Sequence, residues 1–298
     1  MKKLLKRLFY LTPPGKKLSK YETFWEPGHY YSSIPESNFG LQVAEKVYEK
    51  VLAVNGIEFN DALQLQLVRN LVPLMRQSSF CNEHKEPGHR FFNRNGIYGF
   101  SDALYLESMI RFLSPSRIIE VGSGFSSALM VDVNEKYFGD RVKLEFIEPY
   151  PDRLMSLLSA EDKAKVRIQI QGLQSVGLDE FMKLEENDIL FIDSSHVAKT
   201  GSDLIYLFFE VLPILKKGVY IHFHDIFSNF EYLPDHFKTI KGFSWNENYF
   251  LRAFLMYNQE FDIVLFTNYL DNKFKEQILE MFPNYPLFTG AQIWLKRI

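Results

Sequence analysis

The sequence predicts an α/β protein organised around a mostly parallel sheet of seven strands, and three observations lead to this fold class. Residues 117–121 form a short β-branched run that is followed by a glycine turn and then by a helix-forming stretch. Further apolar runs of strand length recur at residues 142–148, 166–170, 188–193, 218–224, 261–266 and 292–295. Several of these runs end in an acidic or polar residue, as strands do when they hold a ligand at their carboxyl ends.

The first strand and its turn read RIIEVGSGFSS over residues 117–127. Gly122 and Gly124 let the backbone take a positive φ or come close to a ligand, so strand, turn and helix together make a unit that can cradle a nucleotide. A dinucleotide fingerprint would carry a third glycine where this chain has Ser127. The turn by itself therefore does not identify which nucleotide binds.

Acids and histidines stand at the ends of the later strands. Glu148 ends the second strand, where a carboxylate can accept hydrogen bonds from both hydroxyls of a ribose. Asp193 ends the fourth strand, and His224 and Asp225 end the fifth. Because neighbouring parallel strands present their carboxyl ends at one edge of a sheet, we expect these residues to converge, together with His196 from the loop after the fourth strand.

Apolar residues at helical spacing predict several helices outside this strand pattern. They are expected at residues 44–52, 64–72, 202–215 and 246–258. Pro73 should end or kink the second of them, because proline cannot donate a helix hydrogen bond. Ser101 is placed to cap the helix that leads into the first strand.

The composition is that of a soluble globular protein, with 46% hydrophobic and 24% charged residues. The single cysteine, Cys81, excludes an intrachain disulfide and a cysteine-based zinc site, and it fits a reducing cytoplasm. Seven basic residues and no acid stand in residues 1–20, so the rest of the chain carries −10 within a total of −3. An acidic body disfavours nucleic acid as a partner.

The basic start has too few apolar residues for a membrane span, and no signal-peptide cleavage site follows it. We expect no transmembrane segment and no export. Two outcomes stay open for this stretch: a solvated tail, or a basic surface that contacts anionic lipid peripherally.

Three stretches resemble motifs of class I S-adenosylmethionine-dependent methyltransferases: EVGSGFSS the first motif, FIEPYP the acidic strand end that binds ribose, and FIDSSH the fourth motif. The segment HVAKTGSDLIYLFFEVLPILKKGVYIHFHDIF, with NENYFLRAFLMYN after it, resembles a bacterial branch grouped as methyltransferase family 24. The resemblance implies a Rossmann-like sheet with helices on both faces and an antiparallel last strand. It divides the chain into a methyltransferase domain at residues 90–298 and an N-terminal extension at residues 1–89, which holds the basic tail, an aromatic segment and helices.

The resemblance further implies that S-adenosylmethionine is the methyl donor. Gly122, Ser123 and Gly124 would receive its amino-acid part, with Glu120 steering nearby groups, and Glu148 would hold its ribose. The expected donor-binding residues are Tyr98, Glu120, Gly122, Ser123, Gly124, Ser126, Glu148 and Asp193.

The acceptor side is expected to use His196, His224 and Asp225 as catalytic residues. Metal-dependent catechol-type methyltransferases have a carboxylate where this chain has Asp193 and an Asp-Asn pair where it has His224 and Asp225, so these three residues form a candidate metal site. A histidine among these ligands moves the metal preference of the site from magnesium toward manganese, iron or zinc. Without a metal, His196 or His224 is the expected general base. His222 shares the strand face of His224 but is expected to be structural.

The predicted function is a cytoplasmic S-adenosylmethionine-dependent methyltransferase acting on a hydroxyl of a small molecule, with a glycan precursor as the acceptor that the resemblance suggests. Two alternatives stay open: an NAD(P)-type oxidoreductase that uses the same glycine turn, and a non-catalytic protein that keeps the Rossmann-like fold. Against the oxidoreductase stand the missing third glycine and the missing TyrxxxLys pair, since Tyr206 is followed by Glu210.

Overall fold

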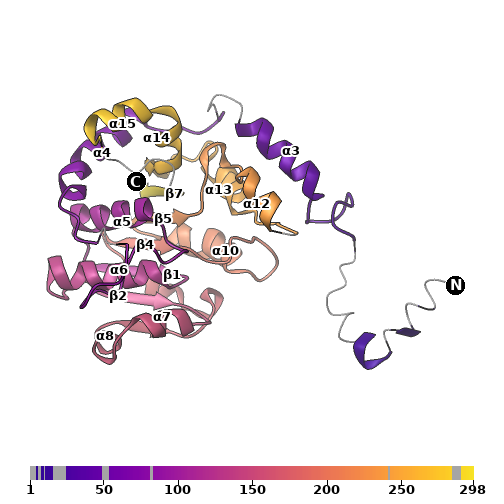
Figure 1. Cartoon of the computed structure of the whole chain (residues 1–298), viewed down its shortest axis with the longest axis horizontal. Coiled ribbons are helices and arrows are strands. Elements are labelled where there is room, and N and C mark those ends of the chain that lie inside the picture. Colours follow the sequence, from indigo (N-terminus) through magenta and orange to yellow (C-terminus); the bar gives the residue numbers. More distant parts are fainter. Residues whose placement is uncertain are drawn as a thin grey trace. The chain divides into compact units, whose positions relative to one another are not determined.

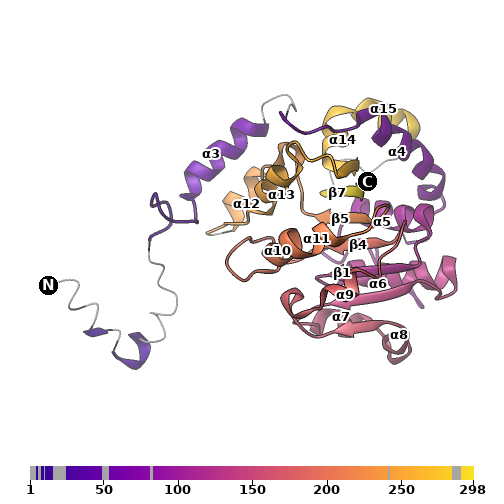
Figure 2. The same ribbon diagram turned by 180° about the vertical axis from the view of Figure 1, so that it is seen from behind.

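The computed structural model describes residues 5, 8–9, 11–15, 25–48, 54–80, 83–240, 242–283 and 290–298 (Figures 1 and 2). It separates into two compact units, Met1–Lys46 with Leu233–Ser244 and Val47–Tyr232 with Trp245–Ile298. Cys81 and the basic residues of the first 20 positions lie outside the described residues, so the expected lipid contact stays a prediction. The second, larger unit contains the sheet.

Seven strands form one sheet in the order β3-β2-β1-β4-β5-β7-β6. The strands are β1 (Arg117–Val121), β2 (Lys143–Ile147), β3 (Arg167–Gln169), β4 (Ile189–Ile192), β5 (Tyr220–His224), β6 (Phe261–Phe266) and β7 (Gln292–Arg297). Strands β1 to β5 pair in parallel, whereas β7 is antiparallel to both of its neighbours, β5 and β6. The predicted fold class is thereby confirmed, and the inserted antiparallel strand sets this sheet apart from the 3-2-1-4-5-6 order of dinucleotide-binding folds.

The helices of the larger unit are α4 (Asp61–Met75), α5 (Phe100–Leu113), α6 (Phe125–Val133), η1 (Asn134–Phe138), α7 (Asp152–Leu157), α8 (Ala160–Lys165), η2 (Leu173–Ser175), α9 (Leu178–Phe181), α10 (Asp203–Tyr206), η3 (Leu207–Val211), α11 (Leu212–Ile214), η4 (Ser228–Phe230), α13 (Glu247–Leu255), α14 (Thr267–Lys273) and α15 (Lys275–Met281). The expected helix at residues 202–215 is a continuous run of α10, η3 and α11. Its apolar sequence follows from its position against the sheet.

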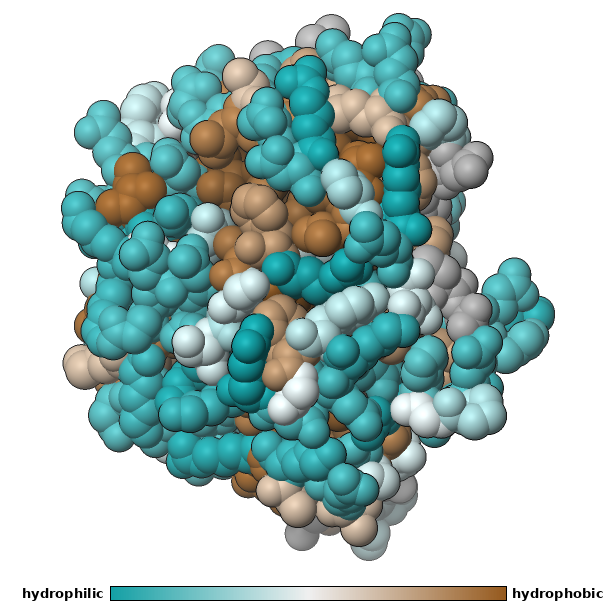
Figure 3. All heavy atoms as spheres, turned by 90° about the vertical axis from the view of Figure 1, so that its left-hand side faces the viewer, coloured by the Kyte–Doolittle hydropathy of each residue, from teal (hydrophilic) through white to brown (hydrophobic). Residues whose placement is uncertain are grey.

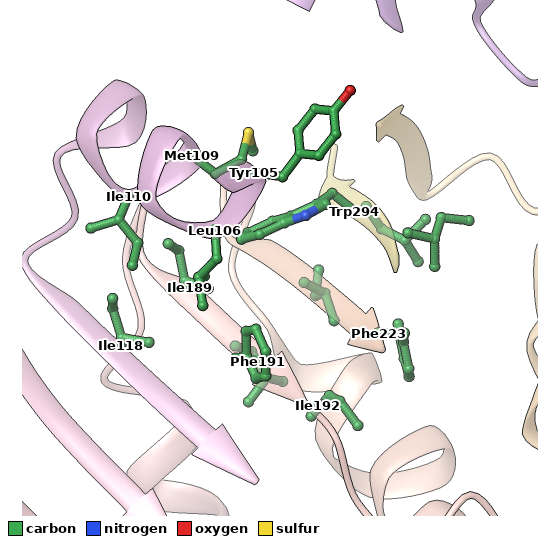
Figure 4. Close-up of a cluster of buried hydrophobic side chains, with 14 of the residues drawn as sticks. Tyr105, Leu106, Met109, Ile110, Ile118, Ile189, Phe191, Ile192, Phe223 and Trp294 are labelled. Carbon is green, nitrogen blue, oxygen red and sulfur yellow. The ribbon is translucent and has the colours of Figure 1, made fainter. Parts of the chain in front are cut away.

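Helices cover both faces of the sheet. On one face, Figure 4 shows Leu106 and Ile110 of α5 directed at Ile118 of β1 and Ile189 of β4. On the other face, the Phe208 ring of η3 lies 5.7 Å from the Phe223 ring of β5, and α13 adds further aromatic rings around it. Because β4 is buried on both sides, all four of its residues are apolar.

Helix α4 clusters with the larger unit, which contains the sheet. Its Gln64 side chain is fully buried, accepts a 2.7 Å hydrogen bond from the Phe266 backbone N–H, and donates to the Phe59 carbonyl at 2.5 Å. Pro73 lies inside α4, two residues before its end. A buried polar side chain thus ties α4 to the end of β6.

Helix α5 begins two residues earlier than expected, at Phe100 rather than Asp102. Gly99 is its N-cap residue, in extended conformation, and no side chain caps the helix. Ser101 lies in the first turn and is fully buried, so the prediction that Ser101 caps this helix was wrong.

The smaller unit contains α3 (Ser37–Tyr48) and α12 (Pro234–Thr239). In the aromatic segment, Trp25 stacks on His29 with ring centroids 4.1 Å apart, while Tyr30 is 91% exposed. Within the part of the chain that the structure describes, no helix combines the length and the apolar character that a membrane crossing requires. Figure 3 shows a mainly hydrophilic face on which apolar side chains gather in the upper half.

Candidate active site

The glycine turn after β1 brings three strand ends together. Gly122 has a φ of 84°, and its N–H donates to the Ile147 carbonyl at the end of β2. A Cβ on residue 122 would lie 1.7 Å from the carbonyl oxygen of Asp193, the residue after β4. Only glycine fits here, because any side chain would need both a left-handed backbone and space that another backbone already fills.

Glu120 precedes this turn: it is the residue before the last of β1, and its side chain is fully buried. Its two carboxylate oxygens accept hydrogen bonds from the hydroxyls of Ser126 and Ser127 in the first turn of α6. Burial raises the pKa of Glu120 to about 8, although both hydroxyls act in the opposite direction. Glu120 does not line the cavity described next, although it was expected among the donor-binding residues. Its hydrogen bonds connect the end of β1 to the first turn of α6.

A cavity of about 440 Å³ opens at the carboxyl ends of β1, β2, β4 and β5. Ten of its lining residues are among those expected from the sequence: Tyr98, Gly122, Ser123, Gly124, Ser126, Glu148, Asp193, His196, His224 and Asp225. Five more were not expected: Ile97, Phe125, Arg153, Ser194 and Trp245.

Glu148 borders the glycine turn on one side of the cavity. One of its carboxylate oxygens accepts a 3.0 Å hydrogen bond from the Ser123 backbone N–H, and the other accepts a 2.8 Å bond from Tyr150 N–H. A carboxylate has about four acceptor positions, so two remain for a ligand. The side chain therefore fixes the turn and still offers oxygen acceptors to the cavity.

The residues after β4 and β5 form an acid–histidine cluster, made up of Asp193, His196, His224 and Asp225. The Nε2 atom of His196 lies 3.4 Å from a carboxylate oxygen of Asp193 and 3.6 Å from one of Asp225. The Nδ1 atom of His224 lies 3.7 Å and 3.6 Å from the same two carboxylates. Each imidazole thus presents one nitrogen to both acids.

His196 makes its closest contact outside this cluster. Its Nδ1 atom lies 2.7 Å from an oxygen of Glu247, the first residue of α13, and both side chains are buried. Burial lowers the pKa of His196, but Asp193, Glu247 and Asp225 outweigh it and raise the pKa to about 10. The imidazole therefore offsets part of the negative charge that the surrounding carboxylates gather.

His224 is held between Tyr98 and Asp102. Its ring stacks on the Tyr98 ring with centroids 5.2 Å apart, and its Nε2 atom lies 3.6 Å from Asp102. Burial lowers the pKa of His224, yet the nearby acids, Asp225 first, raise it well above its ordinary value. Burial first, and then the charges of Asp102, Asp193 and Glu120, raise the pKa of Tyr98 well above its ordinary value, so its phenol keeps its proton.

The most compact ligand group in the described residues is Asp193, His196 and Asp225, whose nearest ligand atoms all lie within 4.8 Å of one another. The sequence analysis used His224 where this group has His196. His196 takes a left-handed backbone with a φ of 57°, and its Nε2 atom lies close to Asp193, three residues before it. That backbone turn could not be read from the residue types.

His222 lies deeper in the sheet. Its ring stacks on Phe191 at 3.9 Å and meets Trp294 edge-on at 4.9 Å. Burial lowers the pKa of His222 well below its ordinary value, which keeps it neutral. It does not line the cavity, in keeping with a structural role.

Glu247 and Trp245 were missed as site residues. Both stand just before or at the start of α13, about 50 positions after His196, and the sequence pattern there indicates only a helix with an apolar face. The one available signal was an acid in the first turn of a helix that follows the fifth strand.

Comparisons with known proteins agree with this fold. Residues 119–226 match the family model described as a methyltransferase domain, in methyltransferase family 24. An uncharacterized protein of Archaeoglobus fulgidus is 33% identical over 172 residues, which span 55% of this chain and 75% of that protein.

Solved structures show weaker likeness. A methyltransferase of Podospora anserina, PaMTH1 with bound SAH, matches over 93% of this chain and 100% of its own, at 14% identity and a TM-score of 0.46. The structure described as cmcI-N160 SAH matches over 42% of this chain and 60% of its own, at 18% identity and a TM-score of 0.32. Family membership rests on the sequence matches.

Proposed function

The chain belongs to the S-adenosylmethionine-dependent methyltransferases whose domain model matches residues 119–226, and on this premise we propose that it methylates a hydroxyl oxygen of a small molecule or glycan precursor. The observation that carries the proposal is the cavity in which the glycine turn, the Glu148 carboxylate and the acid–histidine cluster meet. One side of it suits a nucleoside, and the other suits the handling of a proton.

The donor side is supported by the contacts around the turn. Backbone groups of Gly122 to Gly124 border the cavity, and Glu148 lies beside them with acceptor positions to spare for two ribose hydroxyls. Tyr98 closes the cavity near His224. The bound donor supplies the methyl group as an electrophile on sulfur, and the protein's task is to hold donor and acceptor in line.

The acceptor side is supported by the distances within the acid–histidine cluster. Two of the histidine-to-carboxylate separations, 3.4 and 3.6 Å at His196 Nε2, are long for hydrogen bonds. Two ligand atoms that each lie about 2.1 Å from one ion are about 3.0 to 3.5 Å apart. These two separations suit a shared divalent ion, and the mixed nitrogen and oxygen set of Asp193, His196 and Asp225 suits manganese, iron or zinc better than magnesium.

A metal held there would act as a Lewis acid that lowers the pKa of the acceptor hydroxyl. The chain's own residues would place that hydroxyl beside Asp193, His196 and Asp225, which line the cavity. Without a metal, His196 or His224 would take up its proton. His224 was expected in the ligand set; its Nδ1 atom faces the same two carboxylates, so it stays a proposed catalytic residue.

We further place the enzyme in the cytoplasm and exclude nucleic acid as its acceptor. The single cysteine and the net charge of −10 beyond residue 20 support these two proposals. Peripheral contact with lipid through the basic start is retained as part of the proposal.

Calorimetry tests the donor assignment first. Purified protein is titrated with S-adenosylmethionine, S-adenosylhomocysteine and NAD, and the first two should bind while NAD should not. Sugars and other hydroxyl compounds are then screened for methyl transfer with labelled donor. Binding of NAD in place of S-adenosylhomocysteine would overturn the proposal and restore the oxidoreductase.

A further inference from the structure

We propose that Glu247 is the positioning residue of the acid–histidine cluster, and that it holds the His196 imidazole with Nδ1–H donated to Glu247 and Nε2 facing Asp193 and Asp225. The inference rests on the proposed function, because it assigns the group that orients a residue of the proposed metal site. Glu247 itself does not line the cavity, so it acts through His196.

The contact between the side chains of His196 and Glu247 is short and shielded from solvent. The Nδ1 atom of His196 lies 2.7 Å from Glu247 Oε2, with the two residues 6% and 1% exposed. An imidazole whose Nδ1–H is donated to a carboxylate has only Nε2 left for other partners. In this ring, Nε2 is the atom that faces Asp193 and Asp225.

The second oxygen of Glu247 makes no hydrogen bond that would explain a carboxylate at this position. Oε1 is buried and has no hydrogen-bond partner among the described residues. A buried carboxylate with one oxygen unsatisfied destabilises the fold, and a glutamine or an apolar side chain in its place would cost less. The contact with His196 is the interaction that explains an acid at this position.

The backbone around His196 is fixed by the same helix end. The His196 carbonyl accepts hydrogen bonds from the N–H groups of Asn246 and Glu247, at 3.1 and 3.3 Å. The Asn246 side chain accepts from Ala198 N–H at 2.6 Å and donates to its carbonyl at 3.1 Å. These bonds hold the left-handed conformation of His196, which a free loop would leave.

His224 lacks an equivalent support. Its Nε2 atom is 3.6 Å from Asp102, beyond hydrogen-bond distance, and Asp102 already accepts from Ala291 N–H and from the Gln292 amide. The positioning role is therefore specific to the Glu247–His196 pair.

The test uses metal-free, full-length protein labelled with ¹⁵N-histidine. A hydrogen-bonded Nδ1–H shielded from water should give a low-field imidazole proton resonance, which is assigned to His196 by its loss in His196→Gln. Wild type is compared with Glu247→Gln, Glu247→Asp and Glu107→Gln. Glu107 is an equally buried glutamate in α5 whose carboxylate contacts Ser78, Arg111 and Tyr137, so it serves as the matched control.

The second readout is the binding of Co²⁺, which is measured by visible absorption and by calorimetry in the absence of donor and acceptor. Glu247→Gln should move the resonance upfield, because an amide oxygen is a weaker acceptor than a carboxylate, and should bind Co²⁺ about 10 to 100-fold more weakly, the scale for loss of a carboxylate behind a histidine ligand. Glu247→Asp should recover part of both signals, because it keeps the charge. Glu107→Gln should change neither.

A resonance with an unchanged chemical shift in Glu247→Gln, or one that is missing from wild type, overturns the proposal, and so does an unchanged Co²⁺ affinity in that variant. If Glu247→Gln does not fold, Glu247→Asp decides, since removing one methylene must shift the resonance. Wild type that binds no Co²⁺ would refute the metal part of the proposed function, while the resonance would still decide the role of Glu247.

Discussion

The carbonyl oxygen of Asp193 fills the place that a side chain on residue 122 would occupy: a Cβ built on Gly122 would lie 1.7 Å from it. The end of β4 and the turn after β1 are thus in direct backbone contact, which fixes the distance between the proposed donor side and the acid–histidine cluster.

Gly122→Ala should disrupt both the fold and the site. The variant combines a left-handed alanine with a backbone clash, so the free energy of unfolding should fall by about 3 to 5 kcal/mol. Urea denaturation measures it. Gly139→Ala is the control, because Gly139 also has a positive φ but no atom within 4 Å of its added Cβ, and it should lose only about 1 to 2 kcal/mol. Equal losses in the two variants would contradict the clash.

Glu148→Ala should weaken binding of S-adenosylhomocysteine by about 1 to 3 kcal/mol, the scale for removing the partner of buried polar groups. The variant also frees the Ser123 N–H, so its thermal unfolding is recorded beside the calorimetric titration. Asp152→Ala, an exposed acid in α7 that does not line the cavity, should bind as wild type does. Undiminished binding in folded Glu148→Ala would remove Glu148 from the donor site.

A chelator should abolish methyl transfer and leave donor binding intact. Manganese or zinc should restore turnover better than magnesium, because the proposed site contains a histidine beside two carboxylates. Asp193→Asn should lose the metal response together with activity. Rates with and without chelator, measured on the same acceptor, give the result.

The metal-free alternative predicts a different pattern. If a histidine alone removes the proton, chelator should have no effect and His196→Ala or His224→Ala should lower turnover about 10² to 10⁴-fold. Full activity of both Asp225→Ala and His224→Ala would exclude both versions and place the catalytic group elsewhere.

The free energy of unfolding should fall at acid pH as the Asp162 carboxylate becomes protonated. Burial raises the pKa of this carboxyl, but hydrogen bonds from Arg90 and Ser159 outweigh burial and lower it to about 2, from an ordinary 3.8. A depressed pKa means that the stabilisation is complete above about pH 4 and is lost as the pH falls toward 2.

Asp162→Asn should therefore reduce the free energy of unfolding by about 1 to 2 kcal/mol at pH 7, and the difference from wild type should shrink between pH 4 and 2. Urea denaturation across this range measures it. Glu161→Gln, the exposed neighbour whose contact is with Lys165 at the surface, should change little at any pH. A constant difference for Asp162→Asn would contradict the assignment.

The sequence was most informative where local pattern and tertiary structure agree. The β1 and β6 strands have the predicted bounds, because each is an apolar run between turn residues that local pattern alone identifies as a strand. Glu148, Asp193 and Asp225 could be placed at one edge because parallel strands end together.

The misses depend on contacts between distant segments. Ser101 has the residue type of a cap, yet it is buried in the first turn of α5 and the helix begins before it. Glu247 meets His196 across 51 positions, and no periodicity in the sequence records such a pairing.

Strand β7 lies between β5 and β6, although it follows both in the chain. During synthesis, the backbone groups with which β5 and β6 pair to β7 therefore have no partner until residues 292–297 have left the ribosome. The same late segment supplies Ala291 and Gln292, which bind Asp102 next to His224. The surroundings of Asp102 and His224 are therefore complete only once this last strand has paired.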